Sequence, residues 1–242
     1  MADVRIQTAQ GIMPAYVSVP AADPPWPGVV ITHDFSGMSQ DLRDQADWLA
    51  AEGFLTVAPD LYYWGNRLAC LRIIMRDIGA RRGRTFDDIE AARAWLVGQE
   101  GCTGVTGVIG FCMGGGYALA LAPESQYSAV STNYGGCPTD AAQWLAGACP
   151  IVGSYGGRDR SPMGRKAGLR LEGILESVGV EHDIKIYPDA GHGFMNQMNP
   201  ADSTLLLSFL GAISGTKYHA AAAQDARRRV VDFFNTHLRS VG

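Results

Sequence analysis

The stretch Gly110-Phe111-Cys112-Met113-Gly114-Gly115-Gly116 decides the fold, because it joins a strand-like run to a helix-like run through one reactive side chain. The apolar residues 105–109 precede it, and residues 117–122 form a helical run after it. This arrangement describes a nucleophile elbow, a sharp turn in which the positions flanking the nucleophile must be nearly free of side chain. Gly110, Gly114 and Gly115 fill those positions, so the sequence predicts that Cys112 is a nucleophile.

Cys112 also has a structural interpretation. Free cysteine is among the most buried residue types, and a glycine-rich turn between a strand and a helix can hold one in the core. At the start of a helix, however, a thiolate is stabilised by the unpaired N–H groups and by the helix dipole. The motif alone leaves both interpretations open.

Two later loops favour the catalytic interpretation. Asp159 ends the stretch Gly156-Gly157-Arg158-Asp159, which follows the apolar run 150–155, and His192 lies in Asp189-Ala190-Gly191-His192-Gly193-Phe194, after the strand-like run 184–187. Taken singly, Asp159 is typical of a turn and His192 of an ordinary loop. Nucleophile, acid and histidine after successive strands follow the chain order of α/β-hydrolases. We therefore expect Cys112, Asp159 and His192 to form a catalytic triad.

Strand and helix patterns alternate along the chain. Most of the expected strands are continuous apolar runs, which indicates strands covered on both faces; they are residues 28–32, 55–59, 105–109, 129–134, 150–154 and 183–187. Helices are expected over residues 39–52, 163–178 and 221–238, and another from Thr85-Phe86-Asp87-Asp88, which resembles a capping box. The pattern predicts an α/β fold, a mostly parallel sheet with helices on both faces. In such sheets ligands bind beyond the carboxyl ends of the strands, where all three triad candidates fall.

Length and composition limit the number of domains and the classes of partner that the protein can have. The 242 residues, with 47% hydrophobic and 18% charged side chains, fit a single globular domain over 1–242. The segment 195–218 fits the alternation poorly and is expected to be an insertion, either a lid, an oligomer contact or a packed extra helix. A net charge of −4 argues against a nucleic-acid partner, and no apolar run approaches a membrane span.

The number and spacing of the cysteines indicate in which cellular compartment the protein works and whether it binds a metal. The chain has five cysteines and no Cys-x-x-Cys, so neither a disulfide framework nor a zinc site is indicated, and no metal or cofactor is expected. The first residues, Met1-Ala2-Asp3-Val4-Arg5, lack the apolar core of a signal peptide. A thiol nucleophile also needs a reducing compartment. The expected location is cytoplasmic.

The chain resembles the dienelactone hydrolase family of the α/β-hydrolase fold over nearly its whole length. The resemblance is carried by Ile31-Thr32-His33-Asp34-Phe35-Ser36-Gly37, Ala58-Pro59-Asp60-Leu61-Tyr62, the Cys112 elbow, Gly157-Arg158-Asp159 and Ala190-Gly191-His192-Gly193-Phe194. It implies hydrolysis of a small lactone or ester by Cys112, with His192 as base and Asp159 orienting it. The N–H of Met113, directly after the nucleophile, is expected to hold the oxyanion. By resemblance, the second donor is Phe35.

Two positions depart from the family. Asp34 stands where the family usually has a glutamate, which contacts the resting cysteine and helps to generate the thiolate. The aspartate side chain is one methylene shorter than glutamate. Asp34 could instead cap the turn that follows it. Asn196 matches the position of an arginine that binds the lactone carboxylate, and asparagine cannot pair ionically with an anion. Arg72 or Arg76 lies nearest to the family's other arginine, although a solvated helix face is the simpler interpretation of this basic run.

The leading hypothesis is therefore a hydrolase that cleaves a small ester or lactone through a thioester on Cys112, working as a monomer or homodimer without nucleic-acid or membrane partners. One alternative keeps the fold and changes the class, to a thioesterase or acyl transferase. Another is a ligand-binding module without catalysis. The complete set of Cys112, Asp159 and His192 argues against that last alternative, because binding alone would not require all three.

Overall fold

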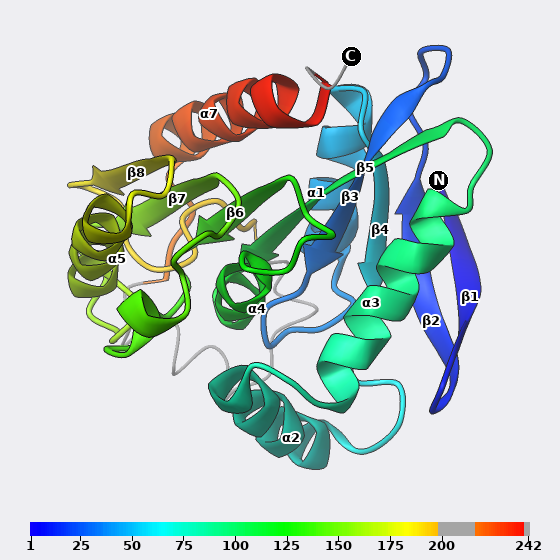
Figure 1. Ribbon diagram of the computed structural model, residues 1–242, viewed down its shortest axis with the longest axis horizontal. Helices are drawn as coiled ribbons and strands as arrows, with labels where there is room; N and C mark the ends of the chain where they lie inside the picture. Colours follow the sequence, from blue (N-terminus) through cyan, green and yellow to red (C-terminus); the bar gives the residue numbers. More distant parts are fainter. Residues whose placement is uncertain (198–215, 240–242) are drawn as a thin grey trace.

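An eight-stranded sheet forms the centre of the molecule in the computed structural model, which describes residues 1–197 and 216–239 (Figure 1). The strand order is β1-β2-β4-β3-β5-β6-β7-β8. The strands are β1 (Ala2–Thr8), β2 (Gly11–Ser18), β3 (Trp26–Thr32), β4 (Leu55–Pro59), β5 (Cys102–Phe111), β6 (Ala129–Asn133), β7 (Ile151–Gly156) and β8 (His182–Tyr187). The pairs from β4 to β8 are parallel, whereas β1 pairs with β2 and β2 with β4 in antiparallel fashion.

Helices cover both faces of the sheet, as the alternating pattern predicts (Figure 1). They are α1 (Gln40–Ala51), α2 (Arg67–Ala80), α3 (Arg84–Val97), α4 (Met113–Leu121), α5 (Arg165–Val178) and α7 (Ala220–Arg239), with a short 3-10 helix η1 (Ala141–Gln143). The buried side chains of α1 and α7 pack into one core cluster, and those of α2, α3, α4 and α5 into another. The central strands β3 to β7 lie between the two clusters, which explains their continuous apolar sequences.

The N-terminal hairpin and α2 are the elements that the apolar pattern did not predict. In β1 the buried positions alternate with exposed ones, so only Ile6 and Thr8 are buried and no continuous apolar run exists. In α2 the buried residues are Cys70, Ile74 and Asp77, a narrow stripe among arginines. Both elements cover an edge or a rim of the core, where few apolar residues suffice.

The start of α3 differs from the expected capping box. The helix begins at Arg84, after Gly83, and no side chain of its own caps it. The carboxylate of Asp77, on α2, takes that role: its Oδ2 accepts hydrogen bonds from Thr85 N (3.2 Å) and Thr85 Oγ1 (3.0 Å). Gly83 has φ of +124°, and a Cβ there would lie 2.6 Å from Asp77 Oδ1. Sequence-local capping was therefore the wrong prediction, because the cap comes from another helix.

The expected insertion at 195–218 falls mostly outside the described residues, since 198–215 are not among them. Its described flanks include Met195 and Asn196, which are both buried. The single-domain expectation for 1–242 stays a prediction. Among the helices of residues 1–197 and 216–239, none combines the length and the apolar character that a membrane crossing requires.

Candidate active site

Cys112 lies between β5 and α4 in a strained backbone conformation, with φ of +55° and ψ of −114°. A Cβ on Gly110 would lie 1.9 Å from Gly114 O, and one on Gly114 would lie 2.1 Å from Thr32 O. Backbone segments thus approach one another where these glycines stand, and any side chain would force them apart. Thr32 Oγ1 completes the turn by donating to Gly114 O at 2.9 Å. The elbow expected from the sequence is present.

Asp159 and His192 are joined by a short hydrogen bond, from His192 Nδ1 to Asp159 Oδ2 at 2.6 Å. Asp159 follows β7 and His192 follows β8, neighbouring strands whose carboxyl ends meet at the same edge of the sheet. The other carboxylate oxygen, Oδ1, accepts from Ser161 N at 2.7 Å. A Cβ on Gly164 would lie 2.6 Å from the Asp159 carbonyl oxygen, so a glycine is needed beside the acid. Both side chains are buried and fixed.

His192 is poised to carry a proton. Burial by itself lowers its pKa, but the hydrogen bond with Asp159 and the neighbouring Cys112 side chain outweigh burial and raise the pKa of His192 to about 10. Because Nδ1 bonds to Asp159, Nε2 is the ring nitrogen that points away from the carboxylate. Nε2 is buried and makes no hydrogen bond within the part of the chain that the structure describes.

A buried polar network behind His192 was not anticipated from the sequence. The Tyr134 ring meets the imidazole edge-on, with centroids 5.2 Å apart, and Tyr134 Oη donates to Asn196 Oδ1. Asn196 Nδ2 donates in turn to Asp41 Oδ2 on α1, whose Oδ1 accepts from Gln197 N at 2.6 Å. The loop after β8 is therefore tied to α1. Partners this far apart in the chain leave no local sequence signal.

Asn196, at the position of the family's carboxylate-binding arginine, thus forms hydrogen bonds within the protein. Arg72 and Arg76 are exposed on α2, and Arg76 pairs with Asp77 at 2.7 Å. This exposed face agrees with the interpretation of the basic run as a solvated helix surface.

The loop after β3 holds His33, Asp34 and Phe35 close to the elbow. His33 Nε2 accepts from Leu61 N at 3.1 Å, so its Nδ1 carries the proton and donates to Asp34 O at 2.5 Å. Burial lowers the pKa of His33, which leaves this histidine neutral with both nitrogens bonded. The Asp34 carboxylate accepts a hydrogen bond from Ser36 N at 2.7 Å, which is the turn-capping contact that the sequence offered as an alternative role. Burial raises the pKa of Asp34.

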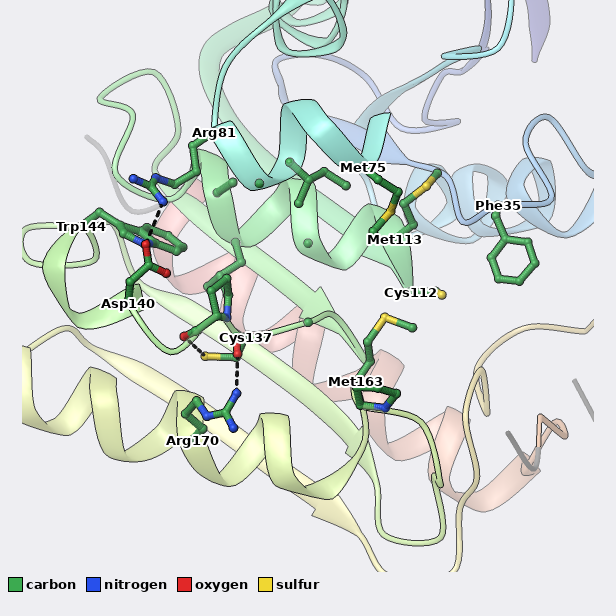
Figure 2. A pocket seen from close by; sticks show the side chains of 18 of the residues that line it. Phe35, Met75, Arg81, Cys112, Met113, Cys137, Asp140, Trp144, Met163 and Arg170 are labelled. Carbon is green, nitrogen blue, oxygen red and sulfur yellow. Dashed lines mark hydrogen bonds and ion pairs between the residues drawn. The ribbon is translucent and has the colours of Figure 1, made fainter. Parts of the chain in front are cut away.

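A pocket of about 590 Å³ opens beside Cys112 and is mainly apolar (Figure 2). One wall comes from α2 through Leu71, Met75 and Ile78, and another from α4, including Met113 and Ala120. The segment 136–144 and Met163 close the remaining sides. Arg81, Asp140 and Trp144 lie at the end away from Cys112 and Phe35 (Figure 2). The volume suits a small-molecule ligand.

No group of three or more histidine, cysteine or acidic side chains within residues 1–197 and 216–239 has the arrangement of a metal site. All five cysteines are free thiols.

Comparison with known proteins identifies the family. A sequence model of the dienelactone hydrolase family matches residues 13–238. The carboxymethylenebutenolidase of Pseudomonas putida is 26% identical over 241 residues, covering 95% of this chain and 94% of that protein. The putative carboxymethylenebutenolidase of Yersinia pestis is 27% identical over 246 residues, covering 93% and 84%.

Solved structures give the same fold. The putative dienelactone hydrolase from Klebsiella pneumoniae superposes with a TM-score of 0.78 at 23% identity, over 96% of this chain and 97% of that one. A match at this identity supports the α/β-hydrolase fold. With the family model spanning nearly all of the sequence, the chain belongs to the dienelactone hydrolase family.

Proposed function

We propose that this protein hydrolyses carboxylic esters or lactones of small molecules, with Cys112, His192 and Asp159 as its catalytic triad. One observation carries the proposal: His192 Nδ1 bonds to Asp159 Oδ2 at 2.6 Å, and the same imidazole lies close enough to Cys112, on its strained turn, for that side chain to raise the pKa of His192. A purely structural cysteine would need neither the strain nor the adjoining dyad.

The reaction runs in two steps on one sulfur. Cys112 Sγ attacks the carbonyl carbon while His192 Nε2 takes the thiol proton, and the new C–S bond forms as the carbonyl oxygen becomes an oxyanion. The intermediate then collapses to a thioester: the C–O bond to the alcohol breaks, and His192 returns the proton to the departing oxygen. Water, deprotonated by His192, attacks the thioester and releases the acid and the thiol. Asp159 holds the imidazole in the required tautomer throughout.

The N–H groups of Met113 and Phe35 are proposed as the oxyanion donors. Met113 is the first residue of α4, where N–H groups have no partner within the helix and the dipole favours negative charge. Phe35 lines the pocket beside Cys112 from the loop after β3 (Figure 2). Losing one such donor typically raises the barrier by about 3 kcal/mol.

A thiol nucleophile favours esters over amides. A thiolate is itself a good leaving group, so the tetrahedral intermediate from an amide reverts unless the amine is protonated. The aryloxide of an activated ester or the enolate of an enol lactone departs more readily. We expect aryl esters to be cleaved faster than the matching anilides. Faster anilide cleavage would refute the preference.

Asp34 is proposed to assist formation of the thiolate. Its raised pKa makes the carboxyl group protonated over a wider pH range, and such a group can donate a hydrogen bond to an anion. Asp34→Asn keeps an oxygen for the Ser36 N–H and removes only the titrating group, so it separates this role from the turn contact. Reactivity of Asp34→Asn equal to that of the wild type would leave the turn contact as the whole role.

The proposed location is cytoplasmic, because oxidation of Cys112 would stop the reaction and reducing compartments protect free thiols. The protein is expected to act as a monomer or homodimer on small molecules.

A panel of small esters and lactones tests the function, with Cys112→Ala as the control. We expect turnover by the wild type and none above background by Cys112→Ala. Iodoacetamide followed by mass spectrometry should show one adduct fewer in that variant if Cys112 is the reactive thiol. Added alcohol or thiol acceptors separate hydrolysis from acyl transfer, because a transferase would form new esters or thioesters. Absence of turnover with every substrate would favour a binding module.

A further inference from the structure

The pocket beside Cys112 extends away from His192. Its described lining includes Cys112, Met113 and Phe35, but no side chain from the loop that carries His192. His192 Nε2 must reach the oxygen of the departing alcohol to protonate it, so the alcohol lies on the His192 side of the sulfur. The opposite side, where the pocket lies, is left for the acyl group.

The walls of this pocket are poor partners for an anion. Leu71, Met75 and Ile78 from α2 face Leu119 and Ala120 from α4 across it. Cys137 is neutral, because burial raises the pKa of its thiol to about 11. A carboxylate placed among these side chains would lose its hydration without gaining a hydrogen-bond donor.

Each of the two arginines of the lining has a partner within the protein. Arg81 Nη1 pairs with Asp140 Oδ2 at 3.3 Å, and its guanidinium stacks over Trp144 at 4.9 Å from the ring centroid. Arg170 Nη1 donates to the carbonyl oxygen of Cys137 at 2.8 Å. Figure 2 shows both at the end of the pocket away from Cys112. Between that end and the sulfur the surface is apolar, and Asn196, at the position of the family's carboxylate-binding arginine, is bonded to Asp41.

We propose that this pocket is an acyl-binding site, and that it selects uncharged esters whose acyl group is an extended apolar chain over short or carboxylated ones. The proposal rests on the proposed hydrolysis at Cys112 and adds the substrate class. Each methylene moved from water into the pocket is expected to raise kcat/KM by up to about four-fold, the equivalent of burying one CH₂ group.

The test compares three p-nitrophenyl esters with the wild-type protein: the acetate, the hexanoate and the monoester of adipic acid, whose six-carbon acyl group ends in a carboxylate. We expect kcat/KM for the hexanoate to exceed that for the acetate and that for the adipate monoester by at least about tenfold each. A hexanoate no better than the acetate, or an adipate monoester equal to or better than the hexanoate, overturns the proposal. The second result would assign the pocket to an acyl chain whose carboxylate reaches Arg170.

A matched pair of variants locates the effect. Ala120 lies in the pocket wall on α4, and Ala120→Leu fills part of the space with a residue that favours helix. Ala221 is exposed on α7, outside this pocket, and Ala221→Leu makes the same chemical change there. We expect Ala120→Leu to lower the hexanoate-to-acetate ratio by tenfold or more and Ala221→Leu to leave it unchanged. An unchanged ratio in a folded Ala120→Leu protein contradicts the assignment.

A binding experiment separates failure of the pocket from failure of the chemistry. Saturation-transfer NMR on Cys112→Ala, with ethyl hexanoate and the monoethyl ester of adipic acid as probes, needs no turnover and no Ala120 variant. Binding of ethyl hexanoate but not of the adipate probe supports the acyl site even if no ester is hydrolysed. Equal or preferred binding of the adipate probe, or no binding of ethyl hexanoate, overturns the acyl site even if hydrolysis occurs.

Discussion

Cys112 has a backbone φ of +55°, a conformation that is costly for any side chain with a Cβ. Cys112→Ala and Cys112→Gly should both abolish ester hydrolysis, but they should differ in stability. We expect the free energy of unfolding of Cys112→Gly to exceed that of Cys112→Ala by about 1 kcal/mol. Glycine relieves the backbone strain, although it costs some chain entropy. Chemical denaturation measures the difference; an alanine variant as stable as the glycine variant would show that the turn is unstrained.

Asp159 allows a second test at the residue scale. Asp159→Asn keeps an oxygen for Ser161 N, but its amide does not stabilise the imidazolium and permits the wrong tautomer. We expect kcat to fall by about 10² to 10⁴-fold with the fold intact. Steady-state kinetics on one aryl ester measures the loss, with circular dichroism as the check on folding. A decrease of less than threefold would argue that the acid has no part in the reaction.

At the scale of elements, the elbow depends on which glycine is replaced. Gly114→Ala would bring a Cβ to 2.1 Å from Thr32 O, a backbone atom that cannot move aside, whereas at Gly116 it would meet only Ile78 Cγ2, at 3.5 Å. We expect Gly114→Ala to lose about 3 kcal/mol or more of unfolding free energy. Gly116→Ala should be neutral or gain up to about 1 kcal/mol, because alanine favours helix over glycine. Urea titration of both variants checks this, and equal stabilities would contradict the close packing of the turn.

Elements differ in how far the sequence predicts them. The strands β3 to β7 contain continuous apolar runs because both of their faces are covered, whereas the edge strand β8 is mostly half-buried or exposed. The predicted bounds of all six strands from β3 to β8 agree with the structure to within three residues. Strand β1 and helix α2 bury only narrow stripes, so composition does not separate them from loops. The capping of α3 by Asp77 depends on a neighbouring helix, which the local pattern around Thr85 cannot show.

The candidate site also has one part that the sequence predicts and another that it does not. The elbow and the loops of Asp159 and His192 are local motifs, so the sequence alone places them at strand ends. The contacts that hold His192 in place are not local: Asn196 bonds to Asp41 across 155 positions, and Gln45 Nε2 donates to Met195 O across 150. Likewise, the pocket arises from α2, α4 and the segment 136–144 together, and no single stretch predicts it.

For the whole molecule, the pKa of His192 sets a pH dependence of stability. A pKa of about 10 in the fold, above the ordinary 6.5, gives a contribution that is fully present below about pH 6.5 and is lost as the pH rises toward 10. The melting temperature of the wild type should therefore fall between pH 6.5 and 10 by at least about 4 °C more than that of His192→Gln, which lacks the titrating group. Thermal denaturation followed by circular dichroism at several pH values measures this. Parallel curves for the two proteins would contradict the raised pKa.

The order of the site along the chain has a consequence for biosynthesis. Cys112 precedes His192 by 80 residues, and the strands β6, β7 and β8 lie between them in sequence. While the chain is being translated, the elbow can emerge from the ribosome well before the histidine that we propose as its base has been made. On the proposed mechanism, the nascent sulfur lacks that base until the last third of the polypeptide docks onto the sheet.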